Sequence, residues 1–266
     1  MNRIQEKTFI VTGASKGIGK VIADHLLQAG ANVVITGRNV ERLNSVKREF
    51  EEKGFCPLAV TADLTIPEDC ENLVKAAVDR FGGVDGLVNN VGLPIRGRFE
   101  KMSMDVFAEV ISGNLLSAAN MTKAALDELC RSIGSVVFIS SIASIHGLPN
   151  AAPYSAAKMG LEKFAESLRI EMYRHRVHVG VIRVGLVDPP PDKIVLRDDG
   201  TYKPVTTRGH QSQESVAWAV LRMIKRRRGK ITMTFPGKSL QIVNWLAPWI
   251  VRLVFTYTQF NRRYEG

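Results

Sequence analysis

The chain has 266 residues, 45% hydrophobic and 23% charged, so it can bury one large core and is not intrinsically disordered. Its three cysteines are far apart, which argues against a disulfide framework and a Cys-x-x-Cys site and fits a reducing compartment. The N-terminus carries charges in place of an apolar signal segment, and no run of about 18 uncharged apolar residues occurs. We therefore expect a cytoplasmic protein without a membrane-spanning helix.

The formal net charge of +10 is concentrated near the C-terminus. Residues 222–266 contain ten Lys or Arg and one acid, so they carry +9 and the first 221 residues carry +1. Seven of the nineteen aromatic residues lie in the last 32 positions. A nearly neutral body therefore precedes a basic, aromatic tail.

Runs rich in Val and Ile alternate with segments of helical periodicity along the body. This alternation predicts an α/β fold, a doubly wound, Rossmann-like parallel sheet of seven strands with helices on both faces. The expected strands are residues 8–11, 32–36, 55–62, 86–90, 135–141, 177–184 and 231–235. The expected helices are residues 17–29, 40–53, 67–81, 104–129, 153–174 and 214–228.

We expect one dinucleotide-binding and catalytic domain over residues 1–236, followed by a C-terminal helical tail over residues 237–266. Residues 186–211 do not fit the alternation, because they are rich in Pro and Gly and too long for an ordinary connection. Such segments are often lids or binding loops. Disorder is the alternative for the tip at residues 198–200.

A glycine cluster, Gly13-x3-Gly17-x-Gly19, lies between the first expected strand and helix. Glycine permits a tight turn and lets a phosphate approach the N–H groups of the helix, although a purely structural turn would have the same composition. The predicted cofactor contacts in this turn are Gly13, Ser15, Lys16, Gly17, Ile18 and Gly19.

The second expected strand ends in Gly37 and Arg38. An NAD-specific site usually has an acid at this point, which would repel a 2′-phosphate, whereas Arg can hold that phosphate. Lys16 in the glycine turn adds a second cation. Either cation alone could be a solvated surface charge, but the pair predicts NADP(H) as the cofactor.

Four further motifs follow in chain order. Asp63 and Leu64 follow the third strand, residues 89–92 read Asn-Asn-Val-Gly, Asn114 lies mid-helix, and Tyr154-x3-Lys158 begins thirteen residues after Ser141. Together with the glycine turn, these motifs resemble the classical short-chain dehydrogenase/reductase family over about residues 7–235. The resemblance implies catalysis by Asn114, Ser141, Tyr154 and Lys158, and cofactor contacts from Asp63, Leu64, Asn90, Gly92, Tyr154, Lys158, Gly185 and Val187.

The family also implies finer roles and shows where this chain departs from its pattern. Asn114 would bind a carbonyl of its own helix and a proton-relaying water, and Lys158 would hold the nicotinamide ribose. Val184 and Pro189 replace the Pro and Thr of the family's PGxVxT motif, which changes the expected lid geometry. Val91 replaces an Ala and adds bulk beside the cofactor.

The four catalytic candidates also make chemical sense by themselves. Tyr154 and Lys158 are four residues apart and share one helix face. A neighbouring ammonium favours the tyrosinate, so Tyr154 could exchange a proton with a carbonyl or alcohol oxygen. Ser141 could polarise the same oxygen, whereas Ser140 would face the other side of its strand. An ordinary amphipathic pair and a strand-end cap are the structural alternatives.

We therefore expect an NADP-dependent oxidoreductase that interconverts a carbonyl and a secondary alcohol on a small, apolar or lipid-like molecule. One alternative is a 3-oxoacyl thioester reductase with a basic patch for an acidic carrier. Another is a catalytically lapsed nucleotide-binding or membrane-associated interaction protein. The five histidines show no metal-ligand clustering, so we expect no metal. His146 lies between Ser141 and Tyr154, where it either borders the substrate pocket or sits on the surface.

Residues 240–255 contain twelve apolar positions in sixteen, and the other four form one narrow helical stripe, with Pro248 expected to kink or split the helix. Three interpretations compete. The tail packs on its own domain or on a partner subunit of a homo-oligomer (a dimer or tetramer), walls an apolar substrate pocket, or contacts a membrane peripherally through residues 238–264. Residues 225–228, 230, 238, 262 and 263 add flanking cations. No recognition motif accompanies this charge, so we expect no nucleic-acid partner. The four stripe residues are Gln241, Asn244, Pro248 and Arg252.

Overall fold

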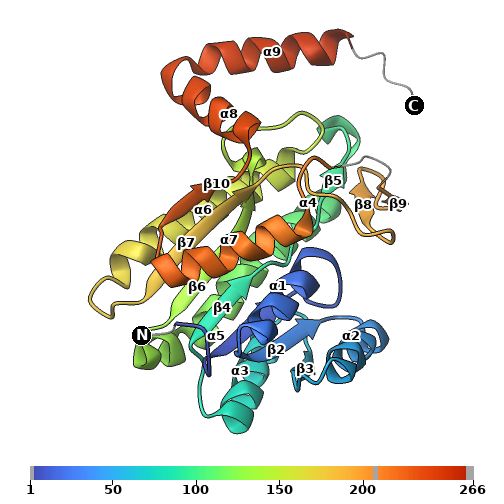
Figure 1. The fold of residues 1–266 in the computed structure, drawn as a ribbon. Coiled ribbons are helices and arrows are strands. Elements are labelled where there is room, and N and C mark those ends of the chain that lie inside the picture. The colour runs from blue at the N-terminus through green and yellow to red at the C-terminus, as the bar shows by residue number, and fades with distance from the viewer. Residues whose placement is uncertain (1–2, 206–208, 262–266) are drawn as a thin grey trace.

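The computed structural model describes residues 3–205 and 209–261, which build a seven-stranded parallel sheet with helices on both faces (Figure 1). In the strand order β10-β7-β6-β4-β1-β2-β3, the chain runs outward from β1 to β3 on one side and from β4 to β10 on the other, as in doubly wound folds. This architecture confirms the predicted fold class. The strands are β1 Thr8–Thr12, β2 Asn32–Gly37, β3 Leu58–Thr61, β4 Gly86–Asn89, β6 Ser135–Ser141, β7 His178–Val184 and β10 Lys230–Thr232.

The core consists of two apolar layers, one on each face of the sheet. Val33 and Ile35 of β2 pack into one layer and Val34 into the other, because side chains alternate along a strand. Helices α1, α2 and α7 cover the first layer, and α3, α5 and α6 cover the second. Burial on both faces explains the continuous apolar runs. The helices are α1 Gly17–Gln28, α2 Val40–Glu52, α3 Pro67–Phe81, α4 Met104–Ile111, α5 Ser117–Ser132, α6 Ala152–Glu171 and α7 Gln213–Arg226.

The prediction of one continuous α-helix over residues 104–129 is wrong for the middle of this segment. A π-helical turn, Ser112–Leu116, separates α4 from α5. Asn114 lies in this turn, fully buried, and its amide nitrogen donates to the carbonyl oxygens of Val110 at 2.8 Å and Leu93 at 2.9 Å. π-helical turns inside helices occur frequently at functional sites, and here the turn places Asn114.

Two strands end or begin more than one residue away from their predicted bounds. The third begins only at Leu58, directly after Pro57, which has no N–H for a sheet hydrogen bond. The last ends at Thr232 instead of residue 235, because Thr234 caps a new helix by accepting a hydrogen bond from the N–H of Gly237. That helix, α8 (Phe235–Leu246), contains the expected domain boundary in its first turn.

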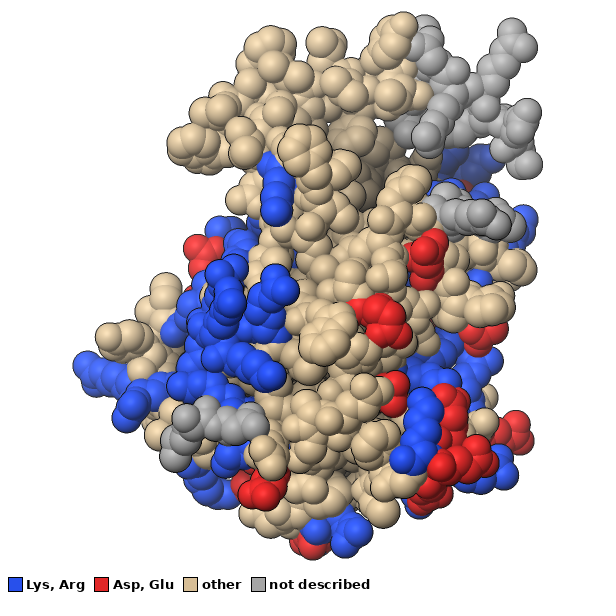
Figure 2. Space-filling view, viewed as in Figure 1, with Lys and Arg blue, Asp and Glu red and all other residues tan. Residues whose placement is uncertain are grey.

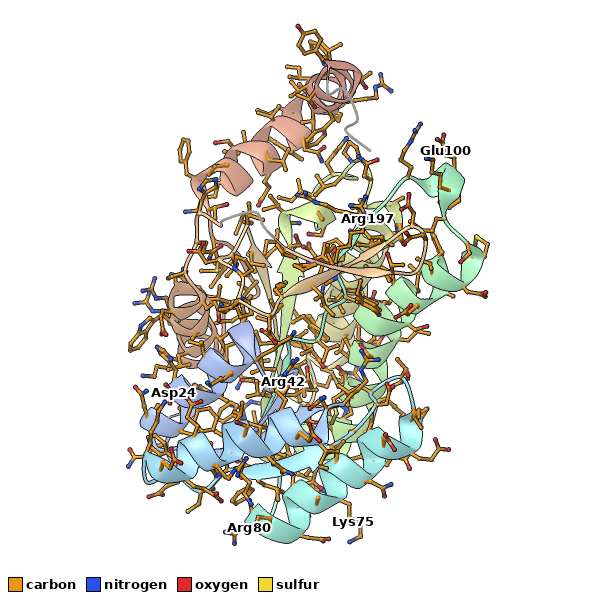
Figure 3. All side chains as sticks on the ribbon, turned by 90° about the vertical axis from the view of Figure 1, so that its right-hand side faces the viewer. Asp24, Arg42, Lys75, Arg80, Glu100 and Arg197 are labelled. Carbon is orange, nitrogen blue, oxygen red and sulfur yellow. The ribbon has the colours of Figure 1, made fainter. Side chains whose placement is uncertain are left out.

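The long segment over residues 186–211 folds into a small sheet of its own. β8 (Ile194–Arg197) and β9 (Tyr202–Pro204) form an antiparallel hairpin, and β8 also pairs in parallel with β5 (Ile95–Arg96). The hairpin turn at residues 198–200 has a defined conformation, with Gly200 at a φ of +81°, in place of the disorder considered as the alternative. In Figure 3, the segment carrying Arg197 lies across the upper part of the sheet.

The tail is split at Pro248 as predicted, into α8 and α9 (Pro248–Asn261). Figure 1 shows both helices rising beyond the sheet at the top of the molecule, and Figure 3 shows them standing clear of it from the side. Gln241 and Asn244 of the polar stripe face the body, so most apolar side chains point away from it. Among the described residues, no helix is long and apolar enough to cross a membrane.

Candidate active site

The glycine turn joins β1 to α1 and needs glycine at each of its three positions. Gly13 and Gly17 have φ values of +62° and +56°, in the left-handed region that favours glycine. A Cβ on Gly19 would lie 2.3 Å from the carbonyl oxygen of Gly13. Lys16, at the N-cap of α1, makes no side-chain capping hydrogen bond, so the first N–H groups of this helix suit an external anion.

A cavity of about 740 Å³ opens beside this turn at the carboxyl ends of β1 to β4. Residues 186–211, called the lid below, cover part of the cavity through Val187, Pro190 and Lys193. Tyr202 of the hairpin donates a hydrogen bond to the Glu109 carboxylate on α4, at 2.7 Å, across this cavity. The predicted cofactor residues that line the cavity are Gly13, Ser15, Lys16, Gly17, Ile18, Arg38, Asp63, Leu64, Asn90, Gly92 and Val187.

Four predicted contacts, Gly19, Tyr154, Lys158 and Gly185, are not among the residues that line this cavity. Gly19 is buried against Gly13, where it permits close packing of the turn. Gly185 packs against Thr234, and its N–H donates to the Gln211 side chain at 3.1 Å. A direct cofactor contact for any of these four residues stays a prediction. The size of the cavity, the glycine turn and the uncapped helix end together fit a bound dinucleotide.

Three cations line one end of the cavity. The Lys16 ammonium and the Arg42 guanidinium lie 3.3 and 3.2 Å from the same carboxylate oxygen of Asp192, which belongs to the lid. Arg38 is 71% exposed, and its guanidinium lies 3.9 Å from the Asp63 carboxylate. Arg42 was missed from the sequence, although its spacing of four residues from Arg38 was a usable signal.

The catalytic candidates lie at the end of β6 and on α6. Ser141 hydrogen-bonds Tyr154. The Lys158 ammonium lies 5.7 Å from the centre of the Tyr154 ring and donates to the Ile139 carbonyl at 3.2 Å. A Cβ on Gly92 would lie 3.2 Å from the Asn114 side-chain oxygen and 3.4 Å from the Lys158 nitrogen. The structure therefore brings all four candidates together beside the cavity.

Burial dominates the protonation of this cluster. It raises the pKa of Tyr154 above its ordinary value, against the hydrogen bond from Ser141, which lowers it. Burial and the charge of Lys193 lower the pKa of Lys158 to about 8. The expected lowering of the Tyr154 pKa by Lys158 is not found, and with its raised pKa Tyr154 is a protonated donor at neutral pH. Lys193 was missed because it lies in the lid, outside any motif.

Comparison with known proteins matches residues 7–199 to the family described as short chain dehydrogenase. A putative ketoacyl reductase of Streptomyces coelicolor is 35% identical over 68% of this chain and 70% of its own length. A 3-ketodihydrosphingosine reductase of Mus musculus is 31% identical over 75% of this chain and 60% of its own. This chain belongs to the short-chain dehydrogenase family.

Solved structures agree with this assignment. An alcohol dehydrogenase from Thermococcus sibiricus, complexed with 5-hydroxy-NADP, has a TM-score of 0.72 and 28% identity over 85% of this chain and 95% of its own. A dehydrogenase/reductase from Sinorhizobium meliloti has a TM-score of 0.75 and 26% identity. The chain is therefore an oxidoreductase with a nucleotide-binding fold, and its relatives support carbonyl–alcohol chemistry.

A buried polar network adjoins β6, the strand that carries Ser141, in this short-chain dehydrogenase. Ser140 faces away from Ser141, as predicted, and donates to the Glu162 carboxylate at 3.2 Å. Glu162 accepts two hydrogen bonds of 2.7 Å from the Arg183 guanidinium, and Arg183 donates a third to Gln241 of α8 at 2.9 Å. The network links α8 to the strand end that carries Ser141.

His146 has a role that neither sequence interpretation anticipated. Its Nδ1 atom donates to the side-chain oxygen of Asn244 at 2.9 Å, and its ring stacks on Phe255 with centroids 5.6 Å apart. Asn244 in turn donates to the Ile145 carbonyl at 3.0 Å. His146 therefore ties α8 and α9 to the segment between Ser141 and Tyr154.

Proposed function

We propose that this short-chain dehydrogenase uses NADP(H) to interconvert a carbonyl and a secondary alcohol. The observation that carries the cofactor choice is the cation cluster of Lys16, Arg38 and Arg42 beside Gly37. An acid at position 37 would repel a 2′-phosphate, whereas guanidinium and ammonium groups form charge-assisted hydrogen bonds with it. The Thermococcus sibiricus alcohol dehydrogenase, which is complexed with 5-hydroxy-NADP, supports the same choice.

The proposed roles of the side chains follow from their contacts. When bound, the nicotinamide would exchange a hydride with the substrate carbon. Tyr154, protonated at neutral pH, donates its proton to the carbonyl oxygen, and Ser141 donates a hydrogen bond to the same oxygen. Lys158 adds positive charge near Tyr154 and has the reach to hold the ribose. Asn114 fixes the π-helical turn beside Lys158.

We further propose an apolar, lipid-like substrate and peripheral membrane contact through residues 238–264. Trp245 and Trp249 are 81% and 60% exposed, and Leu253 and Tyr257 extend the same apolar surface. This surface is tied through His146 to the segment between Ser141 and Tyr154. A substrate leaving an apolar phase at α8 and α9 would therefore enter beside the catalytic residues. The Mus musculus relative, named for a lipid ketone, supports this class.

The charges do not gather on the apolar helices as the sequence suggested. Arg227 lies at the opposite, amino edge of the sheet, whereas Lys238 and Arg252 are exposed on α8 and α9. Figure 2 shows few charged side chains over the two helices and many Lys and Arg lower on the left flank. Membrane binding would then depend mainly on the apolar surface, with a smaller contribution from charge. Residues 262–264 lie outside the described part of the chain.

Titration with NADPH and NADH tests the cofactor assignment. Loss of the 2′-phosphate contacts corresponds to more than about 1.4 kcal/mol, so NADPH should bind at least about tenfold more tightly than NADH. Replacing Arg38 and Lys16 by Gln should remove most of this preference, whereas Lys75→Gln, an exposed lysine on α3, should not. Equal affinities in the unaltered protein would refute the role given to the cation cluster.

Vesicle co-sedimentation with light scattering tests the membrane proposal. We expect binding to anionic vesicles, weaker binding to neutral ones, and loss of both when Trp245 and Leu253 are replaced by Asp. Trp218→Asp is a matched control, because Trp218 is also exposed, at 59%, but lies on α7. A stable homo-oligomer that ignores vesicles would show that the apolar surface is a subunit interface.

The Streptomyces coelicolor relative favours the 3-oxoacyl thioester reductase as second candidate. Turnover of a carrier-bound thioester much faster than that of free ketones would favour it. Cofactor binding without turnover of any carbonyl would support the third interpretation, a catalytically lapsed interaction protein.

A further inference from the structure

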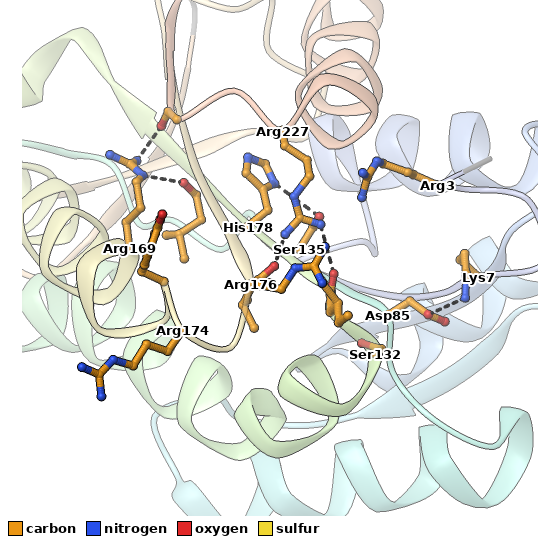
Figure 4. A pocket seen from close by; sticks show the side chains of 16 residues that line it. Arg3, Lys7, Asp85, Ser132, Ser135, Arg169, Arg174, Arg176, His178 and Arg227 are labelled. Atoms are coloured by element: carbon orange, nitrogen blue, oxygen red, sulfur yellow. Dashed lines mark hydrogen bonds and ion pairs between the residues drawn. The ribbon is translucent and has the colours of Figure 1, made fainter. Parts of the chain in front are cut away.

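A second cavity, of about 1080 Å³, lies at the amino edge of the sheet, where β6 and β7 begin (Figure 4). Ser135 and His178, the first residues of these strands, line it, whereas Ser141 and Val184 end the same strands near the catalytic residues. Six residue steps of about 3.3 Å separate the two edges by about 20 Å. The cavity is therefore distinct from the proposed active site.

The lining of this cavity is strongly basic. Asp85 is its one carboxylate among the described residues, and Lys7 lies 3.0 Å from it. Burial lowers the pKa of His178 to about 4, so this ring is neutral at physiological pH. Six cations and one carboxylate leave a lining charge of +5. The cations are Arg3, Lys7, Arg169, Arg174, Arg176 and Arg227.

Main-chain carbonyls hold two of these arginines in place without neutralising them. Arg227 donates to the carbonyls of Ile133, at 3.0 Å, and of Arg176. Arg169 donates to the carbonyls of Val179 at 2.9 Å and Gly229 at 2.7 Å. Figure 4 shows Arg176 and Arg227 in the middle of the cavity lining, with Arg169 and Arg3 on either side and Arg174 pointing away from them. The guanidinium groups of Arg169 and Arg227 are therefore held in position before any ligand arrives.

The negative ends of nearby helices offset only part of this positive charge. Helices α5, α6 and α7 all end at this edge, and each C-terminus carries about half a negative charge. Three such ends offset about 1.5 of the five positive charges, and about 3.5 remain. The arginines therefore exceed what capping these helices requires.

Residues in the left-handed backbone region lie around the cavity. Ile133, Arg176 and Arg227 have φ values of +52°, +58° and +49°, which residues with a side chain rarely adopt. They are three of the five non-glycine residues with positive φ in the described chain. Ile133 and Arg227 are the left-handed C-caps of α5 and α7, a common way for helices to end, so this backbone geometry places side chains at the cavity and adds no separate argument for a ligand.

We propose that this cavity binds a soluble phosphorylated anion with at least two negative charges. Guanidinium groups match the oxygens of a phosphate in paired hydrogen bonds, and the volume admits more than one phosphoryl group. A lipid headgroup has the same chemistry, but the apolar helices α8 and α9 lie at the other edge of the sheet. The preference for a soluble anion over a lipid headgroup rests on the proposed function, in which α8 and α9 form the membrane surface; anion binding itself does not.

Titration calorimetry with pyrophosphate, on the full chain saturated with NADPH, tests this site. Arg3→Gln with Arg174→Gln removes two cations whose side chains make no hydrogen bond or ion pair within the described residues. Arg48→Gln with Lys123→Gln makes the same change of charge on exposed residues outside the cavity. Lys16→Gln with Arg38→Gln reports any pyrophosphate bound in the cofactor cavity instead.

We expect one pyrophosphate per chain, bound at least tenfold more weakly by the Arg3/Arg174 variant and within twofold of the unaltered protein by the other two. Absence of binding to the unaltered protein would refute the proposal. Equal weakening by the Arg48/Lys123 variant would show a general effect of charge, and loss in the Lys16/Arg38 variant would place the anion in the cofactor cavity. Binding of anionic vesicles through Arg3 and Arg174, without pyrophosphate binding, would refute a soluble ligand.

Discussion

Replacing Lys158 by Met should stabilise the cofactor-free protein while abolishing its activity. Lys158 is 3% exposed, and burial with the charge of Lys193 lowers its pKa from 10.5 to about 8. One pKa unit corresponds to about 1.36 kcal/mol, so the charged ammonium costs the folded state about 3 kcal/mol at neutral pH. Losing the hydrogen bond to Ile139 offsets about 1 kcal/mol of this gain. The net gain in unfolding free energy is about 2 kcal/mol.

The pH dependence gives the sign of the effect. Between about pH 8 and 10.5 the unfolded chain keeps the Lys158 proton and the folded chain releases it, so stability rises with pH. This group contributes a rise of about 2 kcal/mol between pH 7 and about pH 9.5, which the Met variant lacks. Staying below pH 10 avoids the titration of Tyr154, whose raised pKa acts in the opposite direction.

Urea unfolding at the two pH values measures both effects. Lys163→Met is the matched control, because Lys163 lies on the same helix with its side chain 81% exposed, and it should change stability by less than about 0.5 kcal/mol. A Lys158→Met variant that is less stable than the unaltered protein at pH 7, or that keeps the same rise with pH, would refute this account of the buried ammonium.

Two further predictions concern charged residues other than the four catalytic candidates. Arg183→Met should lower the unfolding free energy by about 3–5 kcal/mol, because it leaves the buried Glu162 carboxylate without its main partner. Adding Glu162→Leu to this variant should recover part of the loss. Urea unfolding measures both variants, and effects of the two substitutions that simply add would contradict this prediction. Asp192→Asn should tighten NADPH binding by about three- to tenfold and leave NADH binding unchanged, because the Asp192 carboxylate competes with a 2′-phosphate for Lys16 and Arg42. Weaker NADPH binding in a fluorescence titration would mean that Asp192 serves closure of the lid instead.

The sequence was informative wherever a residue's role depends on local spacing. The glycine turn, the strand-end Ser141 and the Tyr154–Lys158 pair could be located because strand and helix periodicity fix which side chains share a face. The continuous apolar run of Val33, Val34 and Ile35 likewise indicated a sheet buried on both sides.

Contacts between distant segments were not predictable in this way. Lys193 lines the cavity beside the glycine turn, and Asp192 contacts Lys16 and Arg42 there, from a segment whose path depends on pairing between β5 and β8. The π-helical turn at Asn114 depends on a hydrogen bond to Leu93, about twenty residues away. The tail's direction was also hidden, because Gln241 and Asn244 bond to Arg183 and His146, and this turns the polar stripe inward.

The central claim is that Tyr154 donates the proton in an NADPH-dependent carbonyl reduction. Carbonyl-dependent consumption of NADPH, measured over ketones of increasing chain length, tests it directly with Tyr154→Phe as the variant and Tyr173→Phe, an exposed tyrosine beyond α6, as the control. We expect rates that rise with the apolar length of the ketone, unchanged activity for Tyr173→Phe, and no turnover with near-normal NADPH affinity for Tyr154→Phe. Equal rates in the unaltered protein and the Tyr154→Phe variant, or no consumption of NADPH with any carbonyl, would contradict the account.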